Sequence, residues 1–310
     1  MNSPYHEGEL LIQRRVGESS IAERNGVMIK DAIIGGALPF IRQQPLAVLG
    51  SLDKEGRLWA SLVFGKPGFL DPAKDARSLR ISLSAVERQP EDPFWRNIAG
   101  NSQIAMLVIE LGSRRRLRIN GRVAAISADE VLIEIDEAYP NCPKYIQRRH
   151  VRSLSAGDSF AAGDVRNGNA LDPEHTALIR RADTFFVATA HVSRGADVSH
   201  RGGNPGFVKV LDETTLSIPD YRGNSMFNTL GNLAVNPNAG LVFPDFENRR
   251  ILQLTGTAEI LWNQADAAGE SGGTGRFWDF HIKYWLETQL PSQIASEFLD
   301  YSPYNPKTEL

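Results

Sequence analysis

The sequence predicts a mainly β protein with flanking helices, built as two tandem copies of a small antiparallel barrel. Short runs rich in β-branched and aromatic residues recur along the chain, and turn residues separate them about every ten positions. The series of runs also occurs twice. This spacing is typical of antiparallel barrels and sandwiches, whereas alternating strand–helix units need longer intervals. We therefore expect an all-β core in each copy.

The internal repeat is visible as matching segments at a nearly constant offset. Arg115–Val123 aligns with Arg250–Ala258, and Gly256 lies 135 positions after Gly121, near the middle of each segment. Three further pairs of segments keep the same order along the chain: 97–102 with 232–237, 66–70 with 204–208, and 46–52 with 185–192. Collinear matches of this kind indicate an internal duplication in which loops have gained or lost residues.

Helices are expected at the edges of the two copies, over Ile21–Arg42, Ser127–Glu137 and Asp172–Arg181. The third of these begins with a capping residue, Asp172, followed by Pro173 at the first helical position. A fourth helix is expected near the C-terminus, because four aromatic residues there have the spacing of one helix face. These residues are Trp278, Phe280, Tyr284 and Trp285.

The predicted organisation divides the chain into five parts. The segment 151–169 is rich in Ser, Gly, Asp and Ala, which is typical of a linker between domains. The five parts are an N-terminal extension and helix (1–42), a first barrel (43–150), a linker (151–171), a second barrel (172–263), and a C-terminal loop and helical tail (264–310).

Composition excludes several classes of protein. Lys and Arg number 34 against 37 Asp and Glu, so a net charge of −3 provides no general field for nucleic acid or an anionic membrane. No window approaches the roughly 18 apolar residues of a membrane-spanning helix. The single cysteine, Cys142, rules out an internal disulfide framework, and residues 1–11 lack the features of a signal peptide. We expect a cytoplasmic protein.

The second copy alone contains a polar segment, residues 218–232, that suits a phosphate. Arg222 supplies bidentate donors, Gly223 allows close approach of the backbone, and amides at the start of an expected helix complete the cradle. An ordinary turn followed by a capped helix has the same composition, and this alternative stays open. The candidate ligand-contacting residues here are Pro219, Asp220, Arg222, Gly223, Asn224, Ser225, Asn228 and Asn232.

The first copy alone ends with a segment, Tyr139–His150, that combines positive charge with a flat apolar surface. It is interpreted as a loop-to-helix junction, and it suits a planar anionic ligand. Cys142 is expected to form a wall of the pocket, because no obvious base lies nearby to make its thiol a nucleophile. The candidate residues are Asn141, Cys142, Pro143, Lys144, Tyr145 and Ile146.

A third candidate segment, Gly195–Val208, replaces an apolar strand of the first copy with a polar one. Ser199, His200 and Arg201 lie on a strand that should face a partner, and Val208 closes the segment. A lone histidine is usually structural, but the position of His200 beside Arg201 and before the 218–232 segment favours a ligand contact.

At these residues the sequence resembles the flavin-binding split-barrel family that includes pyridoxamine 5′-phosphate oxidase. The resemblance runs from His6–Glu9 to about Trp262 and is closest to a two-copy, FMN-binding subgroup, whose two signatures match Gly223–Asn232 and Asn141–Gln147. It implies that FMN lies between two barrels, with the later copy holding the phosphate and ribityl chain. The site is implied either within one chain or across a homodimer. The characteristic C-terminal substrate segment of the oxidase is not recognisable, so vitamin B6 oxidation is not expected.

The resemblance implies an FMN-dependent oxidoreductase that takes hydride from NAD(P)H or another donor. Lys144 and Arg201 are candidates to stabilise charge on the reduced ring, and no residue stands out as a general acid or base. Alternatives are a flavin, haem or deazaflavin carrier or sensor, and an interaction protein whose site has decayed. The run Arg114–Arg118 is interpreted as an exposed strand face and not as an RNA-binding surface, because no aromatic stacking platform accompanies it.

Overall fold

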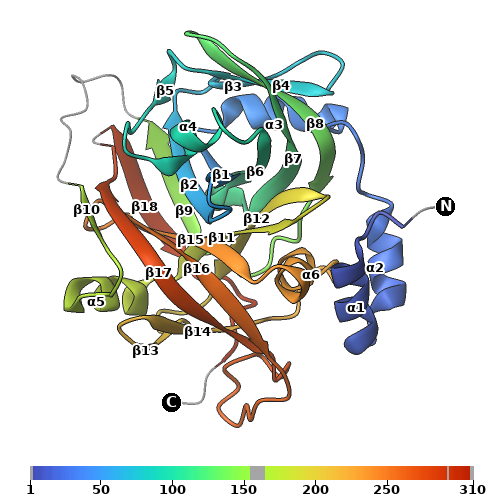
Figure 1. The fold of residues 1–310 in the computed structure, drawn as a ribbon, viewed down its shortest axis with the longest axis vertical. Coiled ribbons are helices and arrows are strands. Elements are labelled where there is room, and N and C mark those ends of the chain that lie inside the picture. Colours follow the sequence, from blue (N-terminus) through green and yellow to red (C-terminus); the bar gives the residue numbers. More distant parts are fainter. Residues whose placement is uncertain (1–2, 154–164, 292, 308–310) are drawn as a thin grey trace.

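Two curled antiparallel sheets pack against each other in this protein (Figure 1). The structure is a computed structural model that describes residues 3–153, 165–291 and 293–307. The first sheet has the order β3-β4-β8-β7-β6-β1-β2-β5. Its strands are β1 (Leu46–Leu52), β2 (Leu58–Gly65), β3 (Leu70–Pro72), β4 (Ser78–Ser82), β5 (Val86–Glu87), β6 (Gln103–Glu110), β7 (Arg115–Ile126) and β8 (Glu130–Pro140).

The second sheet repeats this plan with the order β12-β11-β15-β16-β17-β14-β13, and β10 pairs with β17. Its strands are β10 (Arg166–Gly168), β11 (Thr184–His191), β12 (Gly195–Gly202), β13 (Lys209–Asp212), β14 (Thr215–Pro219), β15 (Asn238–Asp245), β16 (Arg250–Leu261) and β17 (Phe277–Gln289). A third, two-stranded sheet joins β9 (Arg148–Ser153) to β18 (Ile294–Asp300), so the segment after the first barrel pairs with the last strand of the chain. The mainly β, two-barrel prediction is confirmed.

Helices are short and lie around the barrels. They are α1 (Glu7–Arg15), α2 (Ser19–Gly26), the 3₁₀ turn η1 (Gly35–Ala37), α3 (Leu38–Gln43), α4 (Pro93–Asn97), the 3₁₀ turn η2 (Leu111–Ser113), α5 (Pro173–Arg181) and α6 (Asn228–Val235). The helix predicted at Asp172 is present as α5, and the Asp172 side chain caps the His175 amide at 2.9 Å. The helix expected over Ile21–Arg42 is confined to the two ends of that range.

Two predicted helices are strands. Ser127–Glu137 lies largely in β8, and the aromatic tail lies in β17, where Trp278, Phe280 and Ile282 are buried and the residues between them are more exposed. An alternation with period two is the mark of a strand, and pairing with β16 along its whole length satisfies the backbone of β17. The junction after Tyr139 is also different from the prediction, because it leads into β9 and not into a helix.

The linker prediction falls partly on residues 154–164, which lie outside the described residues. At its two ends the chain is in strands, since 151–153 complete β9 and 166–168 form β10.

The duplication is confirmed by a matching irregularity in the two barrels. Strands β7 and β16 each shift register at the aligned glycine, against β8 and β17 respectively. A Cβ at Gly121 would lie 2.0 Å from the Glu134 carbonyl oxygen, and a Cβ at Gly256 would lie 2.0 Å from that of His281. Both bulges therefore require a residue without a side chain, which explains why this glycine is kept in each copy.

Among the described residues, one hydrophobic core lies inside each barrel and a third lies in the seam between them, while a smaller cluster contains Tyr5, Ala22, Tyr139 and Met226. Successive residues of β1 alternate between two of these cores, with Ala47 and Leu49 inside the first barrel and Leu46 and Val48 in the seam. Because both faces of the central strands are covered, every side chain of β2 and β11 is buried. The two barrels therefore form one packed unit.

Replacing Gly256 with alanine should destabilise the fold by about 1–3 kcal/mol, because the added methyl group collides with the backbone of β17. Chemical denaturation monitored by tryptophan fluorescence measures this change in the free energy of unfolding. Gly36→Ala is the control, since no described atom lies within 4 Å of its added Cβ, and it should change stability by less than about 0.5 kcal/mol. Equal effects of the two substitutions would contradict the bulge argument.

Candidate functional site

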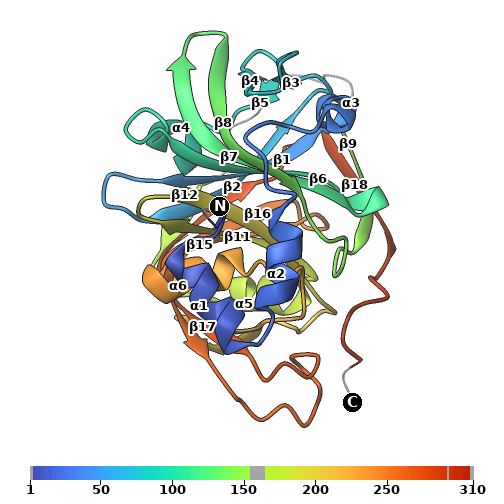
Figure 2. The same ribbon diagram turned by 90° about the vertical axis from the view of Figure 1, so that its right-hand side faces the viewer.

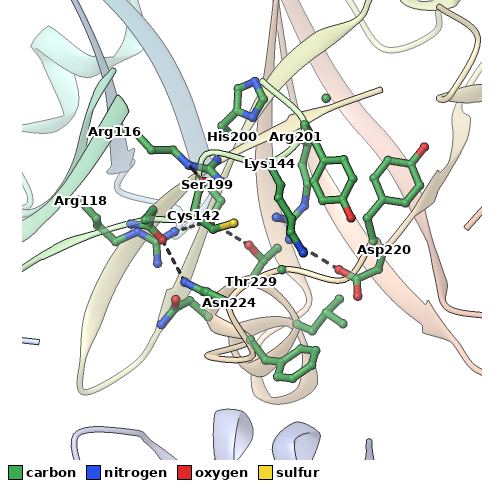
Figure 3. Close-up of a pocket in the computed structure, with 18 of the residues that line it drawn as sticks. Arg116, Arg118, Cys142, Lys144, Ser199, His200, Arg201, Asp220, Asn224 and Thr229 are labelled. Atoms are coloured by element: carbon green, nitrogen blue, oxygen red, sulfur yellow. Dashed lines mark hydrogen bonds and ion pairs between the residues drawn. The ribbon is translucent and has the colours of Figure 1, made fainter. Parts of the chain in front are cut away.

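A pocket opens where the two barrels meet, and both barrels contribute to its walls (Figure 3). From the first barrel come β6, β7 and the loop after β8, and from the second come β12, the loop after β14 and the start of α6. The pocket is lined by Leu107, Arg116, Arg118, Asn141, Cys142, Lys144, Tyr145, Ser199, His200, Arg201, Gly202, Asp220, Tyr221, Gly223, Asn224, Ser225, Phe227, Asn228, Thr229 and Leu230.

Four cationic side chains line this pocket, and only part of their bonding capacity is used. Arg116 donates from Nε to the Cys142 carbonyl oxygen at 2.7 Å, and Arg201 lies 3.8 Å from a carboxylate oxygen of Asp220. Lys144 lies 5.5 Å from the centre of the Tyr304 ring. The crowding of like charges in a partly closed site favours binding of an anion.

Arg118 is the most deeply held of the four cations. It donates from Nη1 to Asp197 and to the Tyr139 hydroxyl, both at 3.0 Å, and from Nη2 to the Ser199 hydroxyl. Burial alone would lower its pKa, but Tyr139 and Asp197 outweigh burial and raise it. The strand β7 of the first barrel is thus tied by a buried ion pair to β12 of the second.

Burial and neighbouring charges lower the pKa values of two other groups. Burial, followed by the charges of Arg118 and Arg201, lowers the pKa of Arg116 to about 9, although Cys142 acts in the opposite direction. Burial and then Arg116, Arg201 and Arg149 hold the pKa of His200 well below its usual range, so this imidazole is neutral. Neither ring nitrogen of His200 has a hydrogen-bond partner among the residues that the structure describes.

The opposite wall is a tight loop that leads into α6. Ser225 and Phe227 both have left-handed backbone conformations, with φ of 62° and 60°. Phe227 is the N-cap of α6 but provides no side-chain cap, and the first residues of the helix, from Asn228 to Leu230, line the pocket. The first amides of a helix lack intrahelical acceptors and carry partial positive charge, so this end of α6 favours an anion.

The two signature segments of the sequence meet within one chain. Asn224 donates from Nδ2 to Asn141 Oδ1 at 3.2 Å, and the Tyr145 hydroxyl donates to the Arg222 carbonyl oxygen at 3.0 Å. The rings of Tyr145 and Tyr221 lie with their centres 4.9 Å apart. A single chain therefore brings the later loop and the earlier cationic loop to the same pocket, and no second subunit is needed for that.

Twelve of the 18 residues predicted from the sequence line this pocket, and six do not. Those that the structure brings together are Asn141, Cys142, Lys144, Tyr145, Ser199, His200, Arg201, Asp220, Gly223, Asn224, Ser225 and Asn228. Those that it does not are Pro143, Ile146, Val208, Pro219, Arg222 and Asn232.

The six exceptions have simple structural reasons. Arg222 and Pro143 are exposed on the loops beside the pocket. Ile146 packs in the seam core and Val208 in the core of the second barrel.

Pro219 and Asn232 serve the structure next to the pocket. Pro219 is a buried residue of β14 whose partner in the sheet is Phe277. Asn232 is fully buried and donates to Thr189 at 3.0 Å and Asp197 at 2.9 Å, which places it beneath the ion pair of Arg118.

Sequence analysis missed the two arginines of β7. The interpretation of Arg114–Arg118 as an exposed strand face is wrong for Arg116 and Arg118, which point toward the pocket, and correct for Arg115. The signal was present in the repeat, because at the constant offset these two arginines correspond to Ile251 and Gln253. Charge that occurs in one copy at a strand position where the other copy is uncharged indicates a site.

The equivalent region around β16 is filled by protein. Ile251 is buried in the seam core, and Gln253 donates to the Ala60 carbonyl oxygen at 2.9 Å and to Ser61 Oγ at 3.1 Å. The duplicated architecture therefore provides the cationic pocket at only one of these two positions.

Comparison with protein families assigns the chain. The family model described as pyridoxamine 5′-phosphate oxidase matches residues 37–154 and again residues 171–273. The chain belongs to the pyridoxamine 5′-phosphate oxidase family. The two matched segments correspond to the two barrels, so this member of the family carries tandem split barrels. No curated protein matches the chain.

Three of the solved structures that match the chain cover 36–41% of it and 90–99% of their own length. HupZ of Group A Streptococcus is 17% identical over 36% of this chain and 90% of its own, with a TM-score of 0.30. A relative of general stress protein 26 from Clostridium acetobutylicum is 14% identical over 41% and 92%, with a TM-score of 0.28. A FAD-binding protein from Mesorhizobium loti is 13% identical over 40% of this chain and 99% of its own, with a TM-score of 0.29.

Within the described part of the chain, none of the helices has the length and apolar character needed to span a bilayer.

The neutral state of His200 should make the fold sensitive to acid. Below about pH 6.5 the unfolded chain takes up a proton at this residue that the folded protein cannot bind, so stability falls as the pH falls. His200→Phe should therefore flatten the decline in unfolding free energy between about pH 6.5 and 5, by up to about 1.4 kcal/mol per pH unit. Urea melts across this range measure the slope, and the exposed His150→Gln is the control. Identical slopes for wild type and His200→Phe would show that His200 is charged in the fold.

Proposed function

We propose that the pocket binds FMN and that the protein is an FMN-dependent oxidoreductase accepting hydride from NAD(P)H. One observation carries the proposal: the uncapped start of α6 and the four cations of Arg116, Arg118, Lys144 and Arg201 line a single pocket in the seam of a split-barrel protein. Family membership is consistent with this ligand.

The phosphate would lie at the start of α6 against the loop Gly223–Asn228. Backbone amides and the Ser225 hydroxyl offer hydrogen bonds there, while Lys144 and Arg201 supply charge from the facing segments. Arg222, which the sequence suggested for this role, is exposed beside the pocket and is replaced in the proposal by Arg201.

Several buried donors support a polar ligand in this pocket. Arg118 Nε, Arg201 Nε and Asn141 Nδ2 are buried and have no hydrogen-bond partner within the described part of the chain. An unsatisfied buried donor costs about 1–3 kcal/mol, so three around one pocket favour a ligand with several acceptor atoms. The phosphate, the ribityl hydroxyls and the ring carbonyls of FMN provide such acceptors.

The remaining walls suit a flat ring. Tyr145 and Tyr221 form an aromatic corner, and Leu107 and Cys142 add apolar surface. When bound, FMN supplies the hydride chemistry, and the protein holds the ring and tunes its charge. A guanidinium such as that of Arg116 or Arg118 would stabilise the negative charge that a flavin gains on reduction.

The purified protein should carry FMN at a stoichiometry of one per chain, because the region around β7 forms the cationic pocket while the equivalent region around β16 is filled by protein. Heating the protein releases the bound flavin. Chromatography then identifies the flavin, and its absorbance gives the number of flavins per chain. Mixing the holoprotein with NADH or NADPH in the absence of oxygen should bleach the flavin band. A protein that binds FMN without bleaching by either nicotinamide is a carrier, and one that takes up only haem or a deazaflavin contradicts the FMN assignment.

Arg116→Gln should weaken FMN binding about 10- to 100-fold, the usual effect of removing one charged hydrogen-bonding partner. Arg115→Gln is a matched control on the same strand, because Arg115 is exposed and lies against the Phe40 ring outside the pocket. Quenching of FMN fluorescence during titration of apoprotein measures both affinities. If the two variants bind FMN equally well, the cationic pocket is not the FMN site.

A further inference from the structure

The loop that the proposed phosphate would contact has an unfavourable backbone. Two residues with side chains, Ser225 and Phe227, have left-handed conformations within three positions. Such conformations persist only where the surrounding structure holds them, and they concentrate at binding sites. The contacts that hold this loop therefore decide whether it is ready for a ligand.

Those contacts come from the N-terminal helices, about 200 positions away in the sequence. Asn25 of α2 donates from Nδ2 to the Asn224 carbonyl oxygen at 2.7 Å, and Gln13 of α1 donates from Nε2 to the Met226 carbonyl oxygen at 3.1 Å. Each bond fixes the residue directly before one of the two left-handed positions. Figure 2 shows α1 beside α6 and α2 next to α1, on the outside of the second barrel.

A third contact comes from Glu9, whose Oε1 accepts a hydrogen bond from Asn228 Nδ2 at the start of α6. Glu9 is buried, and burial together with the charge of Asp197 raises its pKa to about 8. At neutral pH this carboxyl is therefore largely uncharged, and it can hold Asn228 without repelling an anion in the pocket.

Helices α1 and α6 also approach each other so closely that their backbones are in contact. A Cβ at Gly8 would lie 2.2 Å from the Gly231 carbonyl oxygen, and a Cβ at Gly231 would lie 2.5 Å from Glu9 Cγ. A helix pair packed this closely cannot slide without moving both members. A displacement of α1 would therefore move the start of α6 and the loop before it.

We propose that the N-terminal helices α1 and α2 are part of the ligand site, with Gln13 and Asn25 as positioning residues that hold the 224–228 loop in its phosphate-receiving conformation. This inference rests on the proposed binding of FMN. It also implies coupling in the reverse direction, because a ligand that needs the ordered loop must stabilise the helices that order it.

The test uses neutral substitutions, so that no charge is added near the phosphate. Gln13→Met keeps the size of the side chain and removes the donor to Met226, and Asn25→Ala removes the donor to Asn224. Arg14→Gln and Arg24→Gln are controls on the same helices, since both positions are exposed. Each protein is titrated with FMN and with riboflavin, which lacks the phosphate, and its unfolding midpoint is measured without ligand.

We expect Gln13→Met and Asn25→Ala to weaken FMN binding about tenfold or more and riboflavin binding by less than about threefold. The controls should change neither affinity by more than about twofold. Equal weakening for both flavins would mean a general structural role and would overturn the inference, as would unchanged FMN binding, which leaves the FMN site itself intact. A wild-type protein that binds neither flavin overturns the proposed function and this inference with it.

Hydrogen exchange of the wild-type protein is a second test of the coupling between the ligand and the N-terminal helices, and it needs no variant. Addition of FMN should slow exchange of the amides in α1 and α2, whereas riboflavin should slow it less. Unchanged exchange in these helices, with clear protection of α6, would show that the N-terminal segment is not coupled to the site.

Discussion

The whole structure depends on central strands that are buried on both faces. In β1, β2 and β11, one set of alternating side chains contributes to the core of the strand's own barrel, while the other set packs in the seam against the other barrel. A seam of this kind excludes water, and a polar group in it is tolerated only with a partner. The pocket lies where this apolar packing ends and β12 turns polar, from Asp197 onward.

Burial strengthens the electrostatic interactions of the charged side chains in the site, because buried charges are little screened by solvent. The ion pair of Arg118 with Asp197 crosses the seam at a side-chain exposure of 3% and 12%, so it is screened far less than the surface pairs. It fixes β7 relative to β12 and orients the guanidinium at the floor of the pocket. Arg116 and Arg201 lie nearby with fewer partners, and burial, followed by the charge of Arg118, lowers the pKa of both. An anion beside these two side chains would favour their charged forms, so this arrangement suits an anionic ligand.

The sequence predicted features of the fold and site correctly where a strand of one copy could be compared with the equivalent strand of the other. The aligned glycines of β7 and β16 and the polar stretch of β12 could be predicted because each copy could be compared with the other. The meeting of the two signature loops was implied by the family resemblance. Prediction failed where the comparison of the copies was not made. The aromatic residues of β17 were judged by helical spacing, although Trp278, Phe280 and Ile282 alternate as in a strand. No local pattern could show that Gln13 and Asn25 reach the 224–228 loop, because long-range packing alone brings them there.

The difference between the two copies explains why a duplicated protein would keep one ligand site. At equal positions of β7 and β16, arginine in the first copy corresponds to Ile251 and Gln253 in the second, and these two residues pack against the first barrel in the seam. Asp92 completes that filled region by accepting hydrogen bonds from Ser61 Oγ at 2.6 Å and the Phe94 amide at 2.9 Å. In a homodimer of single barrels, the regions around the two equivalent strands must have the same sequence, whereas in a tandem chain they can differ. Here the region around β16 packs the two barrels together. The region around β7 can therefore gather cations that would destabilise the fold without a ligand.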